Sequence, residues 1–408
     1  MKKTFPVIFL AILFFLPSIC LAAGVIGLPK TGQTISYAAG DDGDIEAGKA
    51  WPDPRFIDNG DGTITDNMTG LMWLKDANPG MALFGGAGFK TWQETLDTVA
   101  AINNGTKDMS PCKDYTANYT DWRLPNINEF TSLLNAGNKN FAAWLNSQGF
   151  FNASDTGYWT STSANLIGIS SPDKAWAMNS AVQSGYLQIT DKNSNTRCTW
   201  LVRGKNAGPC KVAKTGQNIC YDTDGNVRPC AGTGEDGEFQ KGVAWPDPRF
   251  IDNGDGTVTD NLTGLMWLKD ISGLGSDTWS ADLVKVSDLN TAPENFRGLL
   301  DYTANYNDWR MPNKNEIMSI VDYSAHLPNP VSILPLNHPF VHVVSGGLAY
   351  WLSSSWLQIL LTRHGALQLN TAKFTAILKL KTAIYGLYGA SPPARHRPEI
   401  WTETARLI

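Results

Sequence analysis

The stretch WPDPRFIDNGDGTITDNMTGLMWLKD, residues 51–76, decides the fold of this chain because it occurs a second time at residues 245–270. The two copies differ at only two positions, which are Ile64 and Met68 in the first copy. Within each copy, NGDG separates two short runs of strand-forming residues, and Asn-Gly and Asp-Gly are the strongest local signals for a β-hairpin. The stretch therefore predicts the same strand–turn–strand unit twice.

Two further blocks repeat downstream of this stretch. They are YTANYxDWRxPNxNE, from Tyr115 and from Tyr302, and YWxS[ST]S, from Tyr158 and from Tyr350. The three blocks recur at offsets of 194, 187 and 192 residues, which is far longer than the period of a solenoid. The whole unit is therefore duplicated, and each unit is long enough to bury a core of its own.

The order of the blocks predicts how the chain is divided. We expect a signal peptide at 1–22, a lead-in at 23–50, a first domain at 51–204, a linker with a cysteine-containing loop at 205–244, a second, incomplete domain at 245–355, and a divergent or frameshifted tail at 356–408. The segment 205–244 matches part of the lead-in, because Thr-Gly-Gln at 31–33 returns at 215–217. Below, 51–204 is repeat one, 245–355 is repeat two, 23–50 is lead-in one and 205–244 is lead-in two.

The N-terminus has the pattern of a bacterial secretory signal. Lys2 and Lys3 precede an apolar run that ends at Leu21, and small residues follow from Ala22. We expect cleavage after Ala22, export to the periplasm, the cell surface or the medium, and no membrane span in the mature chain. A retained anchor and lipidation of Cys20 are the alternatives. Loss of the two lysines takes the net charge from −5 to −7, which argues against nucleic-acid binding.

Five cysteines remain after removal of the signal, and export permits disulfides. We expect Cys112–Cys198, which would close a long loop in repeat one, and Cys220–Cys230, which would close a short loop in lead-in two. Cys210 is then left over, and sequence alone does not fix the pairing. No CxxC or Cys/His pattern indicates a zinc site.

Each repeat reads as mostly β with one or two helices. Further strands of repeat one are expected at 71–74, 158–161 and 200–203. Apolar residues at helical spacing predict a helix at 91–101. Asn126, followed by Glu129 three residues later, forms the capping-box signature of a helix at 126–134. The acidic run 41–44 reads as an exposed turn of lead-in one.

These blocks together resemble the Lcl C-terminal domain family, named for the end domain of a collagen-like bacterial adhesin. Its pattern FxDNGDGTVTDNxTGLMW, DWRLPxxxEL, YWSST and a closing VR is matched in repeat one at 56–73, 121–130, 158–163 and 202–203. The RLPxxxE core with its late VR is also similar to the formylglycine-generating-enzyme and C-type-lectin-like group. The resemblance implies an α+β, C-type-lectin-like fold, with a mostly antiparallel sheet, flanking helices and long loops, in two tandem copies.

Repeat two stops resembling repeat one after Trp351. Residues 356–408 contain seven Lys and Arg, two Glu and no Asp, and the closing VR is missing. We expect this tail to be out of frame or replaced, so that repeat two lacks its final strands. A genuine but divergent ending is the alternative.

Aromatic and arginine side chains are the expected ligand-binding residues. They are Trp51, Asp53, Arg123, Trp159, Trp245 and Arg310. Exposed tryptophans suit sugar rings, and Trp73 and Trp176 would extend such a shelf. The planar guanidinium of Arg123 suits an acidic ligand, or else an internal ion pair with Glu129 or Asp121.

Carboxylates surround the two glycine-rich turns and are the expected metal ligands. They are Asp58, Asp61, Asp66, Asp252, Asp255 and Asp260. Calcium prefers oxygen ligands from such loops, although the spacing departs from the EF-hand register. The alternative is a hairpin whose side chains bond its own turn amides. No other cofactor is expected.

The distribution of histidines argues against catalysis. All five lie after residue 325, so repeat one has none for a Ser-His-Asp or Cys-His mechanism. We expect a non-enzymatic, exported binding module for glycans or cell-surface polymers, in an adhesin or envelope protein. The family likeness implies carbohydrate or glycosaminoglycan binding, although an acidic chain suits sulfated polymers poorly. A structural or protein-interaction domain and a cryptic hydrolase are the alternatives. The ligand and the oligomeric state stay open.

Overall fold

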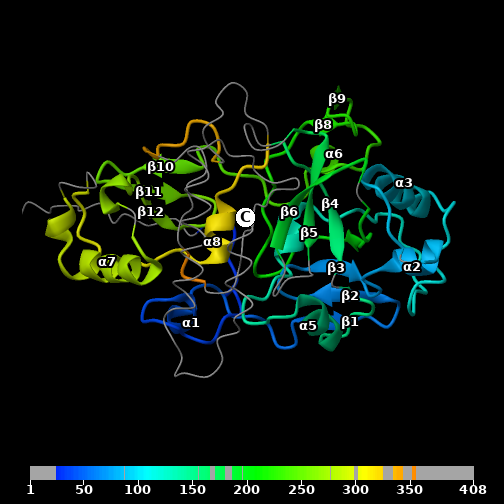
Figure 1. Ribbon diagram of the computed structural model, residues 1–408, viewed down its shortest axis with the longest axis horizontal. Coiled ribbons are helices and arrows are strands. Elements are labelled where there is room, and N and C mark those ends of the chain that lie inside the picture. The colour runs from blue at the N-terminus through cyan, green and yellow to red at the C-terminus, as the bar shows by residue number, and fades with distance from the viewer. Residues whose placement is uncertain are drawn as a thin grey trace, which may run out of the picture.

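The computed structural model describes residues 24–86, 88–154, 156–165, 171–179, 186–194, 196–275, 277–297, 302–324, 334–342 and 352–354. Over these residues the protein is a mixed α/β molecule, built of several small antiparallel sheets and few helices (Figure 1). Among the described helices, none combines the length and the apolar character that a bilayer crossing requires. The predicted signal peptide and the predicted tail lie outside the described residues.

Repeat one opens with a four-stranded antiparallel sheet in the order β1-β2-β3-β7. Its strands are β1 (Phe56–Asp58), β2 (Thr63–Asp66), β3 (Leu71–Leu74) and β7 (Val202–Arg203). In the turn between β1 and β2, Gly60 and Gly62 have φ of 77° and 82°, a left-handed conformation that glycine adopts without steric cost. The predicted hairpin is confirmed, and β7 adds the closing VR to its edge.

The second sheet of repeat one has the order β4-β5-β6 and is covered by helices. The remaining elements of the repeat are β4 (Gly157–Ser163), β5 (Lys174–Asn179), β6 (Tyr186–Asp191), α2 (Pro79–Phe84), α3 (Trp92–Asn103), α4 (Ile127–Thr131) and α5 (Phe141–Ser147). Thr91 caps α3 and Asn126 caps α4, each in a complete capping box. Both predicted helices are therefore confirmed.

Aromatic side chains fill the core of repeat one. Trp73 packs against Trp200 and Phe130, with ring centroids 5.1 and 6.0 Å away. Offset and edge-on ring pairs of this kind contribute beyond the area that they bury. The core therefore joins the first hairpin, helix α4 and the C-terminal part of the repeat.

Repeat two contains the same hairpin in the same register. Its elements are β10 (Phe250–Asp252), β11 (Thr257–Asp260), β12 (Met266–Leu268), η1 (Ser272–Leu274), α7 (Trp279–Thr291), η2 (Pro293–Phe296) and α8 (Lys314–Ser319). Phe250 pairs with Asp260 as Phe56 pairs with Asp66. Asn313 caps α8 in another complete capping box, as Asn126 caps α4. The duplicated sequence thus builds the same local structure twice.

The lead-ins are folded segments. Lead-in one holds α1 (Asp42–Ile45), and lead-in two holds β8 (Cys220–Tyr221), β9 (Val227–Arg228) and α6 (Asp236–Phe239). The predicted exposed turn at 41–44 is wrong, because Asp41 and Asp42 are buried. In Figure 1, α1 lies below α7 and α8, on the side of repeat two, whereas α6 lies beside β4 of repeat one.

Candidate functional site

The arginine of each DWR block is bound to a carboxylate of its own repeat. Arg123 donates from both terminal nitrogens to Glu129, with Nη2 2.6 Å from Oε1. Glu129 also accepts the backbone N–H of Asn126 at 3.0 Å, so the pair fastens the start of α4. Arg310 and Glu316 repeat the arrangement at α8. The internal ion pair with Glu129 is confirmed. Both arginine forks are filled by carboxylates of their own repeats, and the expected ligand role of the two arginines stays a prediction.

Most of the expected aromatic shelf is buried. Trp73, Trp159 and Trp176 belong to the core, and the indole N–H of Trp159 donates to the carbonyl of Lys90 at 2.9 Å. A buried indole with a bonded N–H cannot stack on a ligand. The expectation for Trp159 is therefore wrong. Its burial depends on distant parts of the repeat, such as Lys90, and so could not be seen in the neighbouring sequence.

Trp51 and Trp245 occupy matching, half-buried positions. Their indole N–H groups donate to the backbone carbonyls of Lys30 and Lys214, at 2.8 and 3.0 Å. The guanidinium of Arg55 lies 4.5 Å from the Trp51 ring, and that of Arg249 lies 4.6 Å from the Trp245 ring. One face of each ring is thus covered by the protein's own cation.

Trp245 nevertheless lines an open cavity of about 560 Å³, with Lys214, Asp322 and Leu336 among its walls. In repeat one, Trp144 packs against Trp51 with ring centroids 5.9 Å apart. Asp53 lies exposed beside Trp51. Trp245 is thus an expected ligand residue that the described structure places at a cavity.

The six hairpin carboxylates do not converge on a common point. Asp58 bonds Lys75 at 2.8 Å, Asp61 bonds the hydroxyl of Thr63 at 2.5 Å, and Asp66 forms a buried pair with Arg55. In repeat two, Asp252, Asp255 and Asp260 have the matching partners Lys269, Thr257 and Arg249. Within the described residues, no group of three or more acidic, cysteine or histidine side chains could hold a metal. The contacts match the alternative in which the side chains serve the turn itself, and the calcium site stays a prediction.

One of the two expected disulfides is present. Cys220 and Cys230 are bonded, which confirms that pairing. Cys112 and Cys198 are separate, buried thiols, so that pairing is wrong. Cys198 Sγ lies 2.9 Å from the hydroxyl of Thr156, whereas Cys112 lies near Asp76. Burial raises the pKa of Cys112 to about 12 and that of Cys198 to about 11, so neither is a reactive thiolate at neutral pH.

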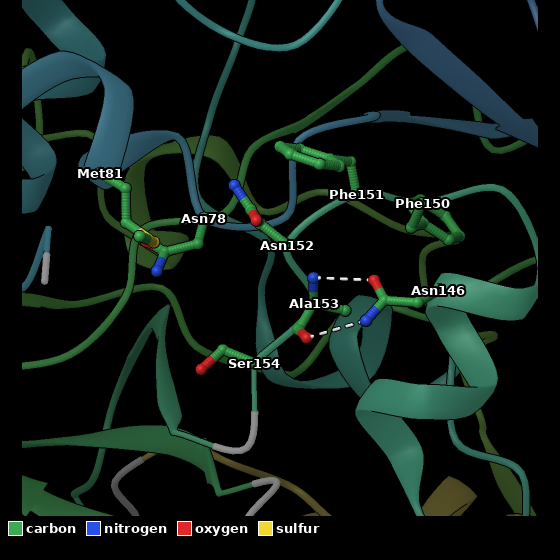
Figure 2. Close-up of a pocket in the computed structure, with 8 residues that line it drawn as sticks. All are labelled: Asn78, Met81, Asn146, Phe150, Phe151, Asn152, Ala153 and Ser154. Carbon is green, nitrogen blue, oxygen red and sulfur yellow. Dashed lines mark hydrogen bonds between the residues drawn. The ribbon is translucent and has the colours of Figure 1, made fainter.

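An open pocket of about 470 Å³ lies in repeat one between α2 and α5 (Figure 2). Its walls are Asn78, Met81, Asn146, Phe150, Phe151, Asn152, Ala153 and Ser154. The loop from Phe151 to Ser154 runs between Asn78 and Met81 on one side and Asn146 on the other. Asn146 holds this loop with two hydrogen bonds to the backbone of Ala153, at 3.0 and 3.1 Å.

Polar and apolar groups alternate around this pocket. Asn78 is only 3 % exposed, and its side-chain oxygen has no hydrogen-bond partner in the described part of the chain. Leaving such a group unbonded costs about 1–3 kcal/mol. Phe151 and Met81 are 42 % and 45 % exposed. Asn152 has a φ of 56°, a left-handed conformation that Asn tolerates better than most residues.

Asp76, the last residue of the repeated stretch, supports the pocket from below. It accepts the backbone N–H groups of Asn78 at 3.1 Å and of Lys113 at 3.4 Å. The Asn152 amide reaches it at 3.5 Å. Burial raises the pKa of Asp76 above its ordinary value. This carboxyl therefore positions Asn78 and Asn152, two of the three asparagines of the pocket.

Repeat two has a counterpart at this place with different side chains. Asp270 accepts the backbone N–H of Ser272 at 2.8 Å, as Asp76 accepts that of Asn78. His342, with a φ of 49°, stands where Asn152 stands, and its Nδ1 lies 2.7 Å from Asp270. Although burial acts to raise the pKa of Asp270, hydrogen bonds from Ser272 and His342 lower it overall.

Sequence reasoning missed the pocket because residues 146–154 lie outside the repeated blocks. The available signals were the position of Asp76 at the end of its block and the asparagines on either side of the Phe150-Phe151 pair. Neither signal indicates that α2 and this loop meet.

Comparison with known families supplies the identity of the repeats. The model of the Lcl C-terminal domain matches residues 62–203 and 256–380, which together exceed half of the chain. The second match continues past residue 355, where the predicted second domain ends. Neither the search of curated proteins nor the search of solved structures gave a match. The matched residues include the strand pairs β2–β3 and β11–β12 and both arginine–carboxylate pairs, and the chain belongs to the Lcl C-terminal domain family.

Proposed function

We propose that this protein is an exported, adhesin-like envelope protein that binds glycans or similar polar polymers through the pocket at Asn78 and Asn152. Membership of the Lcl C-terminal domain family fits an adhesin-like envelope protein. The Cys220–Cys230 disulfide is in keeping with export. The family was named for the end domain of an adhesin, and this resemblance motivates the ligand class.

The observation that carries the proposal is an open pocket in which the amides of Asn78, Asn146 and Asn152 lie among the exposed apolar side chains of Met81 and Phe151. Sugars present hydroxyl donors and acceptors on their rims and C–H faces on their rings. Amide side chains can both donate and accept hydrogen bonds, and an exposed Phe151 offers a flat apolar surface. A few fixed polar groups among apolar ones are typical of small-ligand pockets.

Binding suits this pocket better than acid–base catalysis. No ionisable side chain is among the eight residues that line it, and general acid–base catalysis needs such a group within reach of the substrate. Asp76 lies beneath Asn78 and Asn152 and is already bonded to two backbone N–H groups. We therefore favour a binding function over a hydrolase activity.

We further propose that each repeat is C-type-lectin-like and that the two repeats are tandem copies. The small antiparallel sheets, short helices and long loops support this fold, as does the shared register of β1–β2 and β10–β11. Two linked sites would raise avidity without any new contact. Because His342 replaces Asn152 in the second site, the two sites would prefer different ligands.

A glycan array probed with the secreted, full-length protein tests the proposal. Asn152→Gly removes the amide and keeps the left-handed backbone, and Phe151→Ala removes the exposed ring. We expect each to reduce retention on the bound glycans by tenfold or more. Ile57→Ala is the matched control, because Ile57 is similarly exposed on β1, away from the pocket. Binding that both pocket variants retain in full would overturn the proposal, as would an array without any retained glycan.

A further inference from the structure

The two lead-ins cross over between the repeats. Lead-in one is joined in sequence to repeat one, yet its folded part contacts repeat two. Lead-in two lies between the repeats in sequence, and its folded part contacts repeat one although it leads into repeat two. The contacts occur at equivalent positions in both halves of the chain, so they form a reciprocal pair.

Lead-in one is bound to repeat two. The side-chain amides of Asn313 and Asn315 donate to the carbonyls of Ala47 at 3.2 Å and Pro29 at 2.9 Å. The hydroxyl of Ser354 donates to the buried carboxyl of Asp42 at 2.5 Å. Near the start of the described chain, the N–H of Ile26 donates to the carbonyl of Leu262 at 2.9 Å.

Lead-in two is bound to repeat one by the same groups. Asn126 and Asn128 donate to the carbonyls of Lys241 at 3.0 Å and Ala213 at 3.2 Å. The hydroxyl of Thr162 donates to the buried carboxyl of Asp236 at 2.7 Å. The N–H of Cys210 donates to the carbonyl of Met68 at 3.0 Å.

Each lead-in also keeps a hold on the repeat that follows it. The carbonyl of Thr31 accepts the N–H of Ala136, and the carbonyl of Thr215 accepts the N–H of Tyr323, at 2.8 and 2.9 Å. The indole bonds of Trp51 and Trp245 described above lie beside these contacts. Each lead-in therefore bridges its own repeat and the opposite one.

The buried aspartate of each lead-in binds a hydroxyl that in turn bonds the first N–H of a helix in the opposite repeat. The hydroxyl of Thr162 accepts the N–H of Ile127, the first residue of α4, while it donates to Asp236. The hydroxyl of Ser354 likewise accepts the N–H of Lys314, the first residue of α8. Free N–H groups at a helix start need such partners. Here the partner hydroxyl is itself bound by an aspartate of the lead-in that contacts the repeat.

A buried lysine reinforces each junction. Lys192 of repeat one donates to the carbonyls of Tyr221 and Asp222 in lead-in two, at 3.1 and 3.3 Å. Lys314 of repeat two is buried near Asp42 of lead-in one, and its Nζ lies 3.5 Å from the carbonyl of Leu134 in repeat one. Without the lead-ins, Lys192 would keep only the hydroxyl of Ser163 as an acceptor among these three, and Lys314 would lose the nearby charge of Asp42, so burial of both ammonium groups would cost more.

We propose that the two repeats form one closed unit by reciprocal exchange of their lead-ins, so that the docking surface of each repeat takes the lead-in of the other. The surface on repeat one consists of Asn126, Asn128 and Thr162, and the surface on repeat two consists of Asn313, Asn315 and Ser354. The occupant in each case is a lead-in of this chain with a buried aspartate at its helical turn. The repeats are therefore mutually dependent, unlike two domains on a flexible linker.

Hydrogen exchange of the full-length protein tests this crossing. Asp236→Ala removes the acceptor in lead-in two and should make the α4 amides of repeat one exchange at least tenfold faster, with α8 unchanged. Asp42→Ala should accelerate α8 and leave α4 unchanged. Two domains on a linker predict the opposite pairing, in which each lead-in variant affects the repeat that follows it. That opposite pairing, or no change in either helix, would overturn the proposal.

Cleavage of the chain between the halves gives a second test that tolerates a poorly folding variant. A protease site inserted after Lys205, at the exposed start of lead-in two, would be cut in the folded protein. Reciprocal exchange predicts that the halves co-elute as one particle with the mass of the intact chain. Halves that separate on size exclusion after complete cleavage would contradict it.

Discussion

Segments 51–76 and 245–270 share 24 of 26 residues and form the same hairpin, yet strand β3 is largely buried and β12 is only half-buried. Trp73 is fully buried against Trp200 and Phe130, and β7 pairs with the outer edge of β3. In the described part of repeat two, no strand pairs with the outer edge of β12. Local sequence thus sets the hairpin and its register, whereas distant segments set its burial.

The largest expected difference between the repeats is at this tryptophan. Trp73→Ala should lower the free energy of unfolding by about 3–5 kcal/mol, because it empties a large site in a packed core. Trp267→Ala should cost about 1–2 kcal/mol, since its ring is only half-buried. Urea unfolding of both variants measures these losses. Equal losses would show that the two hairpins are equally buried.

The arginine–carboxylate pairs should show a similar but smaller asymmetry. Arg123→Met leaves Glu129 buried and unpaired, which should cost about 3–5 kcal/mol. Arg310→Met should cost about 1–2 kcal/mol, because the Arg310 side chain is 27 % exposed against 5 % for Arg123 and water can partly replace it.

The matched double variants sharpen this test of the pairs. Combining Arg123→Met with Glu129→Leu should recover part of the loss, since it removes the stranded charge. A double variant as unstable as Arg123→Met alone would show that packing of the arginine, and not its charge, is what matters.

The disulfide distinguishes the lead-ins, because Cys220 and Cys230 of lead-in two have no described counterpart in lead-in one. Replacing both by Ser should cost about 2–3 kcal/mol through the lost loop closure. Hydrogen exchange should then rise in β8 and β9 and leave α1 unchanged. Faster exchange in α1 to the same extent would mean that the bond stabilises the molecule as a whole.

The last predicted effect is a pH dependence at Asp236. Burial raises the pKa of this carboxyl to about 7. The charge of Glu129 adds to the rise, whereas the hydroxyls of Thr162 and Thr215 and the charge of Arg123 oppose it. Its folded pKa exceeds the unfolded value, so its contribution is fully present near pH 4 and is lost as pH rises through about 7. This loss of stability amounts to up to about 1.4 kcal/mol per pH unit, and Asp236→Asn removes it.

Urea unfolding of wild type and Asp236→Asn between pH 5 and 8 measures this effect. The stability of the variant relative to wild type should increase up to about pH 7 and then level off. Lys192 acts in another window, because burial lowers its pKa to about 7 and its contribution is lost as pH falls from about 10 toward 7. If the difference in unfolding free energy between wild type and Asp236→Asn stays constant between pH 5 and 7, the raised pKa of Asp236 is contradicted.

Features set by neighbouring residues could be predicted from the sequence. The NGDG turns, the Asn126–Glu129 capping box and the Arg123–Glu129 pair each depend on residues within about one helical turn or one hairpin, and all are present. Residue spacing alone was enough to identify them, because their geometry is fixed by backbone conformation.

Features that depend on distant partners could not be predicted. The acidic turn at Asp42 is buried because Ser354 lies against it. Trp159 lies on β4 and is buried, with its indole N–H bonded to the distant carbonyl of Lys90. Cys112 and Cys198 differ in their neighbours, which no spacing reveals. The pocket at Asn78 requires α2 to meet the loop after α5, and no repeated block marks that contact.

Hydrogen exchange of the wild-type hairpins tests the central claim most directly, since both carry the same sequence in one molecule. The account predicts one protection pattern in β1–β3 and β10–β12, following the shared register, with exchange at least tenfold faster in β11 and β12 than in β2 and β3. Equal protection of the two hairpins, or protected amides at non-equivalent positions, would contradict it.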